Sequence, residues 1–256
     1  MNKSDQPPCS STPNSDSKTS SPLMNRALPF SVGEGISICG CDLSMNGSGI
    51  CVLNLDKNLD IVSCDWLGFT QVKKNQRDNH VIWYTKDDYF SRFKITEMMI
   101  EGIIQKVKDC KYAAIEDFAF GAVGMLANIG EFVGQVSWEI WKRNIALRWY
   151  GPGISKKHFT GRGNADKVGM WEQFQIVKGI KPDLKDYPVP QTAKGVSPTS
   201  DIVDAYALAL LLQKELKLRT GILKPSDLND VDKAVFGKKK KSTILENPFD
   251  IRTNFQ

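Results

Sequence analysis

The sequence predicts one α/β domain built around a mixed β-sheet that is flanked by helices, and three observations lead to this prediction. Three strand-like segments joined by short polar turns come first, which is typical of an antiparallel meander. Helix-like and strand-like segments then alternate, and strand–helix–strand crossovers make the later strands parallel. The chain has 256 residues, of which 41% are hydrophobic, so it can bury one sizeable core.

Both ends of the chain differ in composition from the segment between them. Residues 1–32 are rich in Ser, Pro and Asn and have few apolar side chains, so we expect a disordered tail there. Residues 221–256 are polar and show no periodicity, and they include four consecutive lysines at 238–241, which we expect to be solvated or to associate with nucleic acid. The predicted domain therefore spans residues 33–220.

The first three predicted strands cover residues 36–43, 50–55 and 59–67. Asp42 lies at the end of the first strand, and a turn rich in Gly, Ser and Asn follows it, which favours a tight connection to the second strand. Residues 68–88 are polar, with basic and aromatic side chains mixed among them. We interpret them as an irregular insertion.

The later elements are predicted from their periodicity and from the residues that interrupt it. In chain order they are a helix over 88–110, a strand over 112–116, a helix over 123–143, a strand over 145–150, a helix over 164–178 and a last helix from 200 to about 219. A loop with four prolines over 179–198 precedes the last helix. Ser197, Thr199 and Ser200 are candidate N-caps of that helix, and Gly221 marks its end.

Acidic side chains stand at three key places in this predicted order. Asp42 ends the first strand and Glu116 ends the fourth, while Asp201 and Asp204 share one face of the last helix. If the first and fourth strands are neighbours, all four carboxylates meet at one edge of the sheet. Four carboxylates without His or Cys make an all-oxygen site, which selects Mg²⁺ or Mn²⁺ over zinc. An acidic, well-capped helix start is the competing explanation for the last two.

Four motifs in this order carry a resemblance to a known family. GCDLSMNGSG at 40–49, AIE at 114–116, KKHFTGRGNADK at 156–167 and DIVDAYALA at 201–209 resemble the motifs of the RuvC-type Holliday-junction resolvases. The resemblance covers residues 36 to about 215. It implies an RNase H-like fold with a mixed five-stranded sheet, in which three antiparallel strands are followed by parallel strands. The 68–88 insertion, the 179–198 loop and both tails depart from the family pattern.

The resemblance also implies an activity and a set of site residues. The activity is metal-dependent endonucleolytic resolution of four-way DNA junctions, with two Mg²⁺ ions per active site and Mn²⁺ as a substitute. The implied metal ligands and catalytic carboxylates are Asp42, Glu116, Asp201 and Asp204. The implied phosphate-binding, catalytic lysines are Lys156 and Lys167. Further candidate DNA contacts are Lys157, Arg162, Phe118 and Phe120. The two phenylalanines could stack on bases at a branch point, with core packing as the competing explanation.

The predicted helix over 123–143 carries a stripe of small residues. Ala127, Gly130, Gly134 and Ser137 fall on one face, where another backbone could approach closely. The resemblance implies that this helix lies at the two-fold axis of a homodimer, which suits a symmetric junction. Packing of the stripe on the protein's own sheet is the competing explanation.

Other functions fit parts of the sequence. The same nuclease chemistry could act on flaps, replication forks or RNA-containing duplexes. An actin-like nucleotide-binding module also begins with a strand, an Asp and a Gly/Ser turn, but it needs further phosphate-binding glycine loops that this sequence lacks. A catalytically inactive junction-binding scaffold is disfavoured because all four acids are present.

Composition narrows the remaining classes. The net charge of +5 permits a polyanionic partner such as DNA without requiring one. The six cysteines form no CxxC motif, which argues against a zinc site and favours reduced thiols in a cytoplasmic protein. No apolar run approaches the length of a membrane span, and the N-terminus lacks the apolar core of a secretory signal.

Overall fold

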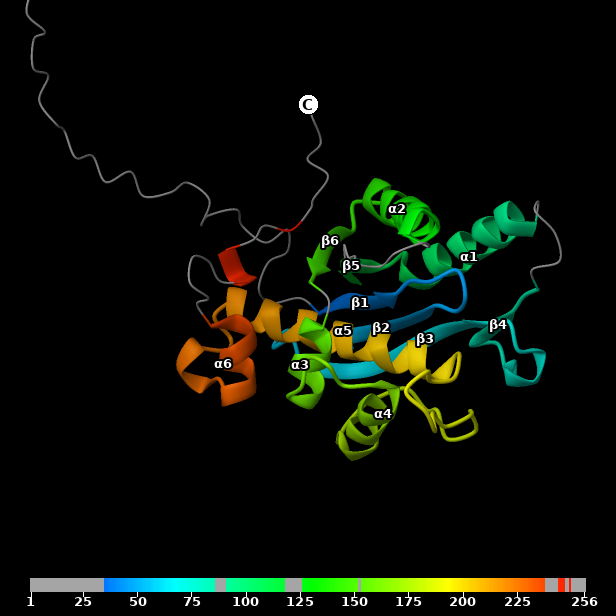
Figure 1. Cartoon of the computed structure of the whole chain (residues 1–256). Helices are drawn as coiled ribbons and strands as arrows, with labels where there is room; N and C mark the ends of the chain where they lie inside the picture. The colour runs from blue at the N-terminus through cyan, green and yellow to red at the C-terminus, as the bar shows by residue number, and fades with distance from the viewer. Residues whose placement is uncertain are drawn as a thin grey trace, which may run out of the picture.

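The computed structural model describes residues 35–85, 91–117, 126–151, 153–237, 244–246 and 249. A six-stranded sheet in the order β4-β3-β2-β1-β5-β6 forms the centre of the molecule (Figure 1). Its strands are β1 Ile36–Asp42, β2 Gly49–Leu55, β3 Ile61–Thr70, β4 Val81–Trp83, β5 Cys110–Glu116 and β6 Ala146–Tyr150. The helices are α1 Ser91–Val107, α2 Leu126–Lys142, α3 Ile154–Thr160, α4 Lys167–Ile176, α5 Thr199–Arg219 and α6 Asp230–Phe236.

The strand directions confirm the predicted mixed sheet. β1, β2 and β3 form the antiparallel meander, and β5 and β6 run parallel to β1. The sheet has six strands where five were predicted. The prediction of an irregular insertion over 68–88 was wrong for its first part. Residues 68–70 complete β3, Lys73–Asn75 form a 3₁₀ turn, and β4 pairs in parallel with the end of β3. An edge strand of three residues is too short to show a period of two, so no sequence pattern reports it.

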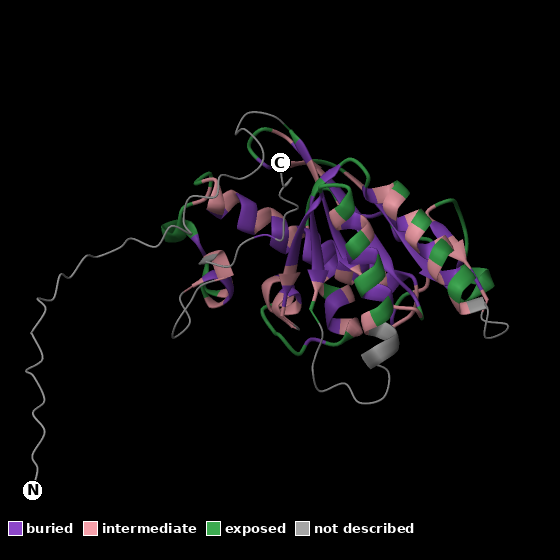
Figure 2. Cartoon of the chain, turned by 90° about the horizontal axis from the view of Figure 1, so that it is seen from above, coloured by how far each residue is buried: buried purple, intermediate pink, exposed green. Residues whose placement is uncertain are grey.

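Two apolar cores hold the helices on opposite faces of the sheet. Helices α1 and α2 cover one face, and α3, α4 and α5 cover the other (Figure 1). Figure 2 shows that buried residues concentrate on the strands and on the inward sides of the helices. The five described cysteines are free thiols, as predicted, and Cys39 and Cys41 both face the α1 and α2 side. Within the described residues, no helix is both long and apolar enough to cross a membrane.

Two glycines let α5 lie directly on β1 and β2. A Cβ at Gly40 would lie 2.1 Å from the carbonyl oxygen of Ala205, and a Cβ at Gly49 would lie 2.2 Å from that of Asp201. Real Cβ atoms do not approach backbone this closely, so any side chain at either position would push the helix away. The close approach fixes the first turns of α5 beside the end of β1.

Two short helices were not predicted. The seven-residue helix α3 follows β6, and the equally short α6 lies inside the segment expected to be a polar tail. Helices of seven residues are too short for a clear hydrophobic period, and isolated ones are unstable, so tertiary packing must stabilise them. Phe159 of α3 and Phe236 of α6 are both buried in the core that contains α5. The outer boundaries of the domain stay a prediction.

The start of α5 differs from its predicted capping. Pro198 occupies the N-cap, and no side chain makes a capping hydrogen bond. The Ser200 hydroxyl accepts a hydrogen bond from the Val196 amide at 2.9 Å, and the Ser197 hydroxyl donates to the Phe69 carbonyl at 2.9 Å. These serines therefore connect the preceding loop to the helix and the sheet instead of capping the helix.

Candidate active site

Three elements bring the four predicted carboxylates to one edge of the sheet. β1 and β5 are parallel neighbours with Cys41 opposite Ile115, so Asp42 and Glu116 leave the sheet at the same end. The first turns of α5 cross this edge and carry Asp201 and Asp204. The Nζ of Lys167 lies 4.0 Å from Oδ2 of Asp42 and donates a hydrogen bond to Oδ2 of Asp204.

Burial and mutual repulsion govern the charges of these acids. Burial raises the pKa of Asp42 well above its usual range, and the charges of Asp204, Asp201 and Glu116 add to the rise while Lys167 opposes it. Burial also raises the pKa of Asp201 to about 6, although Lys167 and the Ser197 hydroxyl each lower it. For Asp42 and Asp201, the nearby positive charge and hydrogen bonds therefore do not fully offset the cost of burying the charged carboxylate.

Lys167 is the cation nearest to the centre of this group. It begins α4, whose N-cap Asp166 accepts a hydrogen bond from the Gly169 amide at 2.8 Å. Burial alone would lower the pKa of Lys167, but Asp204, Asp42 and Asp201 together raise it above its usual value. One ammonium therefore provides the positive charge that partly balances three carboxylates.

Glu116 has a different set of partners. Its Oε1 accepts a hydrogen bond of 3.1 Å from the backbone amide of Gly153 at the start of α3. Burial raises the pKa of Glu116, while the Gly153 amide and the charges of Lys156 and Lys167 lower it. The turn into α3 therefore positions this carboxylate and brings Lys156 to its side.

The donor chemistry of the acidic edge fits a divalent metal ion. Oδ2 of Asp201 and Oδ1 of Asp204 are buried without a hydrogen-bond partner among the described residues. Buried carboxylate oxygens without partners are costly, and a hard cation with oxygen ligands would satisfy them. Over the described residues, no three His, Cys, Asp or Glu side chains are already gathered closely enough to hold a metal ion. The four acids lie at the same edge of the sheet and near the Lys167 ammonium, but their carboxylates do not converge on a single metal position.

The other predicted site residues lie to one side of the acids or outside the described residues. Lys157 lies on α3, and Arg162 lies exposed in the turn that leads from α3 to α4. Phe118 and Phe120 fall outside the described residues, and their predicted stacking on bases stays a prediction.

The small-residue stripe of α2 has an open part and a buried part. A Cβ built at Gly130 or at Gly134 would meet no atom of the described residues within 4 Å. Ser137 is buried, and its hydroxyl donates to the Val133 carbonyl at 2.6 Å, while Trp138 beside it is 56% exposed. Packing on the protein's own sheet therefore does not explain the two glycines. The side chain of Ala127 is outside the described set.

Sequence reasoning missed two contributors to the site. The Gly153 amide reaches Glu116 only because α3 folds back after β6, and a backbone donor has no sequence signature. The Ser197 hydroxyl lies close to Asp201 and lowers its pKa. Ser197 stands four residues before Asp201, and this short spacing is the sequence signal that could have predicted the contact.

The sequence matches no protein-family model and no curated protein. Among solved structures, the Thermus thermophilus RuvC structure is similar at 16% identity and a TM-score of 0.47, covering 74% of this chain and 99% of that one. T. thermophilus RuvC in complex with Holliday junction substrate is similar at 17% identity and 0.46, with the same coverage. The yeast mitochondrial Holliday junction resolvase Ydc2 is similar at 12% and 0.46, covering 78% of this chain and 87% of that one.

The fold itself is RNase H-like by its strand arrangement. The strands β3, β2, β1, β5 and β6 lie side by side in that order, with three antiparallel strands followed by two parallel ones. The directions are those that the motif resemblance implied, and β4 extends the sheet beyond them.

Proposed function

We propose that this protein is a metal-dependent, structure-specific endonuclease that resolves four-way DNA junctions by paired symmetric incisions. The observation that supports this best is the set of four carboxylates at one sheet edge, two of them with buried oxygens that have no hydrogen-bond partner among the described residues. An all-oxygen acidic site of this kind serves phosphodiester hydrolysis, and the order of its motifs resembles that of RuvC-type resolvases.

Each residue of the site has a role in this proposal. Two Mg²⁺ ions, or Mn²⁺ in their place, would be held by Asp42, Glu116, Asp201 and Asp204. When bound, the ions would supply activation of water and stabilisation of the leaving oxygen. They would also take over the charge balance that Lys167 now provides, which would leave its ammonium free to face the scissile phosphate. Lys156, next to Glu116, would add a second cation there, and Lys157 and Arg162 would contact the adjoining DNA backbone.

We expect the purified protein to cut a labelled four-way junction into paired nicked products with Mg²⁺ and to bind it uncut with a chelator. Parallel reactions with flaps, forks and RNA–DNA duplexes test whether the nuclease acts on one of these substrates instead. Faster cutting of any of these substrates would reassign the activity to that substrate. Binding without cutting in both Mg²⁺ and Mn²⁺ would favour the inactive scaffold. Nucleotide binding in calorimetry would favour the actin-like reading.

We also propose that the protein acts as a homodimer through α2, because resolution needs two symmetric nicks and one site cuts one strand per encounter. Gly134→Leu would insert bulk where two backbones approach, and over-packing typically costs about 1–3 kcal/mol. We expect this variant to elute as a monomer at micromolar concentration and to accumulate singly nicked junctions.

Gly134→Ala is the matched control for this experiment. It adds only a methyl group into open space and should keep the dimer. In a helix it should also raise the free energy of unfolding by about 1 kcal/mol. A Gly134→Leu variant that stays dimeric and resolves junctions normally would place the two-fold axis elsewhere.

A further inference from the structure

The 71–85 segment, which joins β3 to β4 and continues past it, is bound to the backbone on both sides of the carboxylates. The Tyr84 hydroxyl donates to the Met45 carbonyl at 2.7 Å, in the turn that follows Asp42. Asn75 is only 2% exposed, and its Nδ2 donates at 2.7 Å to the carbonyl of Ser197, just before α5. The 71–85 segment is therefore hydrogen-bonded to the edge of the sheet that carries the acids.

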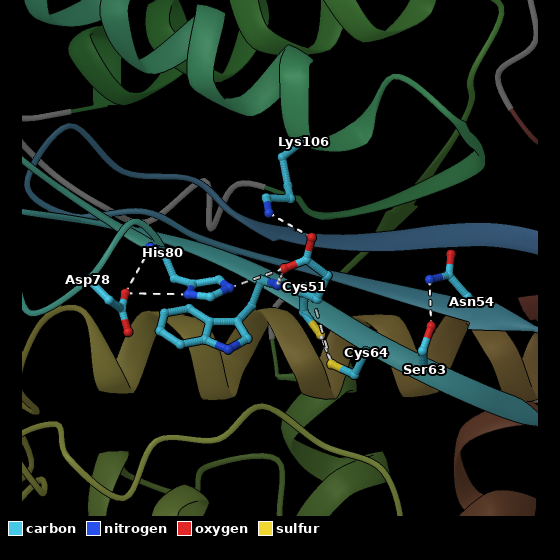
Figure 3. Close-up of polar contacts among 9 residues, drawn as sticks. Cys51, Asn54, Ser63, Cys64, Asp78, His80 and Lys106 are labelled. Atoms are coloured by element: carbon cyan, nitrogen blue, oxygen red, sulfur yellow. Dashed lines mark hydrogen bonds and ion pairs between the residues drawn. The ribbon is translucent and has the colours of Figure 1, made fainter.

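A second set of contacts fixes the same segment to β3 and α1. His80 lies between two carboxylates, with Nδ1 3.4 Å from Asp78 and Nε2 3.6 Å from Asp65, and its ring stacks on Trp66 at a centroid distance of 4.7 Å. Lys106 of α1 donates to the other oxygen of Asp65 at 2.7 Å. Figure 3 shows His80 pointing toward Asp78 and Lys106 reaching down from the helix above. The two acids of this region thus already have partners, and these contacts attach the segment to β3.

The outward side of the segment carries positive charge. Lys73, Lys74 and Arg77 are exposed, and none of them forms an ion pair with any described residue. The ammonium of Lys73 lies over the Trp83 ring, 5.2 Å from its centroid, which limits the freedom of this lysine without neutralising it. Three cations on a segment that is hydrogen-bonded to the acidic edge form a surface suited to a polyanion.

The position of this surface complements that of the basic residues already considered. Lys156, Lys157 and Arg162 follow β6, at one end of the strand order, whereas the 71–85 segment lies at the β3 and β4 end. The acidic edge therefore lies between two groups of cations. A duplex arm whose strand passes through the acidic edge could place phosphates on both groups.

We propose that the 71–85 segment is a second phosphate-binding surface, on which Lys73, Lys74 and Arg77 contact the backbone of a nucleic-acid arm next to the active site. The inference rests on the proposed function, since the neighbouring carboxylate site is what selects nucleic acid among polyanions. An acidic protein surface would be the other fit, and the experiment separates the two.

The experiment compares two triple variants of the full chain. Lys73→Gln, Lys74→Gln and Arg77→Gln are combined in the test variant, and the control combines Lys57→Gln, Lys108→Gln and Lys111→Gln. The control lysines are also exposed but lie at the opposite edge of the sheet. Binding of a four-way junction is measured in chelator, so that no cleavage is needed, over a range of salt concentrations.

We expect the test variant to bind at least about tenfold more weakly and to show a shallower salt dependence. Each lost phosphate contact lowers the slope of log K against log salt by about 0.9, so two or three contacts would change it by about 2–3. The control variant should keep the wild-type slope. Lys74→Glu alone, with its larger local change in charge, tests the same surface if the triple variant fails to fold.

The outcomes separate this inference from the proposed function. A test variant that binds with wild-type affinity and slope overturns the inference, even if the wild type resolves junctions, and then leaves an acidic protein as the partner to seek. A weakened, shallower binding curve supports the inference. It does so also when the wild type cuts no branched substrate, a result that would overturn the proposed function alone.

Discussion

Each substitution that removes a charge from the acidic edge is expected to lower junction cleavage more than about a hundredfold, since even outer-shell partners of a metal ligand contribute about 10–100-fold. The four variants are Asp42→Asn, Glu116→Gln, Asp201→Asn and Asp204→Asn. Junction binding in chelator should remain, because it depends on cations elsewhere. Single-turnover cleavage rates with saturating Mg²⁺ provide the measurement.

Stability separates loss of chemistry from loss of fold in these variants. Oδ2 of Asp201 is buried without a hydrogen-bond partner among the residues that the structure describes, and burial makes its charge costly in the metal-free protein. The neutral amide of Asp201→Asn reduces the repulsion from Asp204. In chelator, the melting temperature of this variant should therefore be equal to or higher than that of the wild type. Added Mg²⁺ should also raise the melting temperature of this variant less than that of the wild type.

Asp117→Asn is the matched control, because Asp117 follows Glu116 directly and is exposed. It should cut junctions at the wild-type rate. Wild-type rates in any two of the four edge variants would show that the metal ligands lie elsewhere.

Glu215→Gln is expected to lower the free energy of unfolding by about 3–5 kcal/mol, the range seen when one partner of a buried ion pair is removed. Glu215 is fully buried on α5 and Arg148 on β6 is 3% exposed. Oε2 of Glu215 accepts from Arg148 Nε at 3.0 Å and from the Tyr150 hydroxyl at 2.9 Å, and Oε1 accepts from Arg219 Nε at 2.7 Å. The neutral amide would leave two guanidinium groups without their carboxylate.

The same cluster holds the described residues near the C-terminus. Arg148 donates to the Ile244 carbonyl at 2.6 Å, and the Phe249 ring lies 4.9 Å from the Arg219 guanidinium. Loss of the carboxylate should therefore loosen this segment as well as lower the midpoint of urea unfolding.

Glu139→Gln is the control for the buried pair. Glu139 pairs with Lys142 and Arg143 on the partly exposed side of α2, and such surface pairs contribute about 0–1 kcal/mol. Equal losses in Glu139→Gln and Glu215→Gln would mean that the buried cluster does not stabilise the fold.

The sheet could be predicted because its signals are local. The strands of the meander are joined by short turns, and their apolar runs are long enough to be recognised, so β1, β2 and β3 appear where the sequence places them, within a few residues. β5, β6 and the long α5 also have clear patterns. A strand–helix–strand crossover predicts that β5 runs parallel to an earlier strand, but its place directly beside β1, which brings Asp42 and Glu116 to one edge, is a finding of the structure.

Tertiary structure alone decided the elements and contacts that depend on distant partners. α3, α6 and β4 are too short to carry a period of their own, and each forms because it packs on a surface made by other elements. In the sequence, Gly40 is an ordinary glycine within a strand. Only the structure shows that α5 packs against it, so that a Cβ at this position would lie 2.1 Å from the Ala205 carbonyl oxygen.

The acidic site divides in the same way. The residue types and their order indicate an oxygen-ligand site, because carboxylates at strand ends and in the first two turns of a helix are visible in the chain itself. The structure adds that Lys167 lies among them, that the Gly153 amide holds Glu116, and that two carboxylate oxygens have no partner among the described residues. These facts follow from how α3, α4 and α5 cross one sheet edge, and such crossings depend on long-range packing that no local pattern encodes.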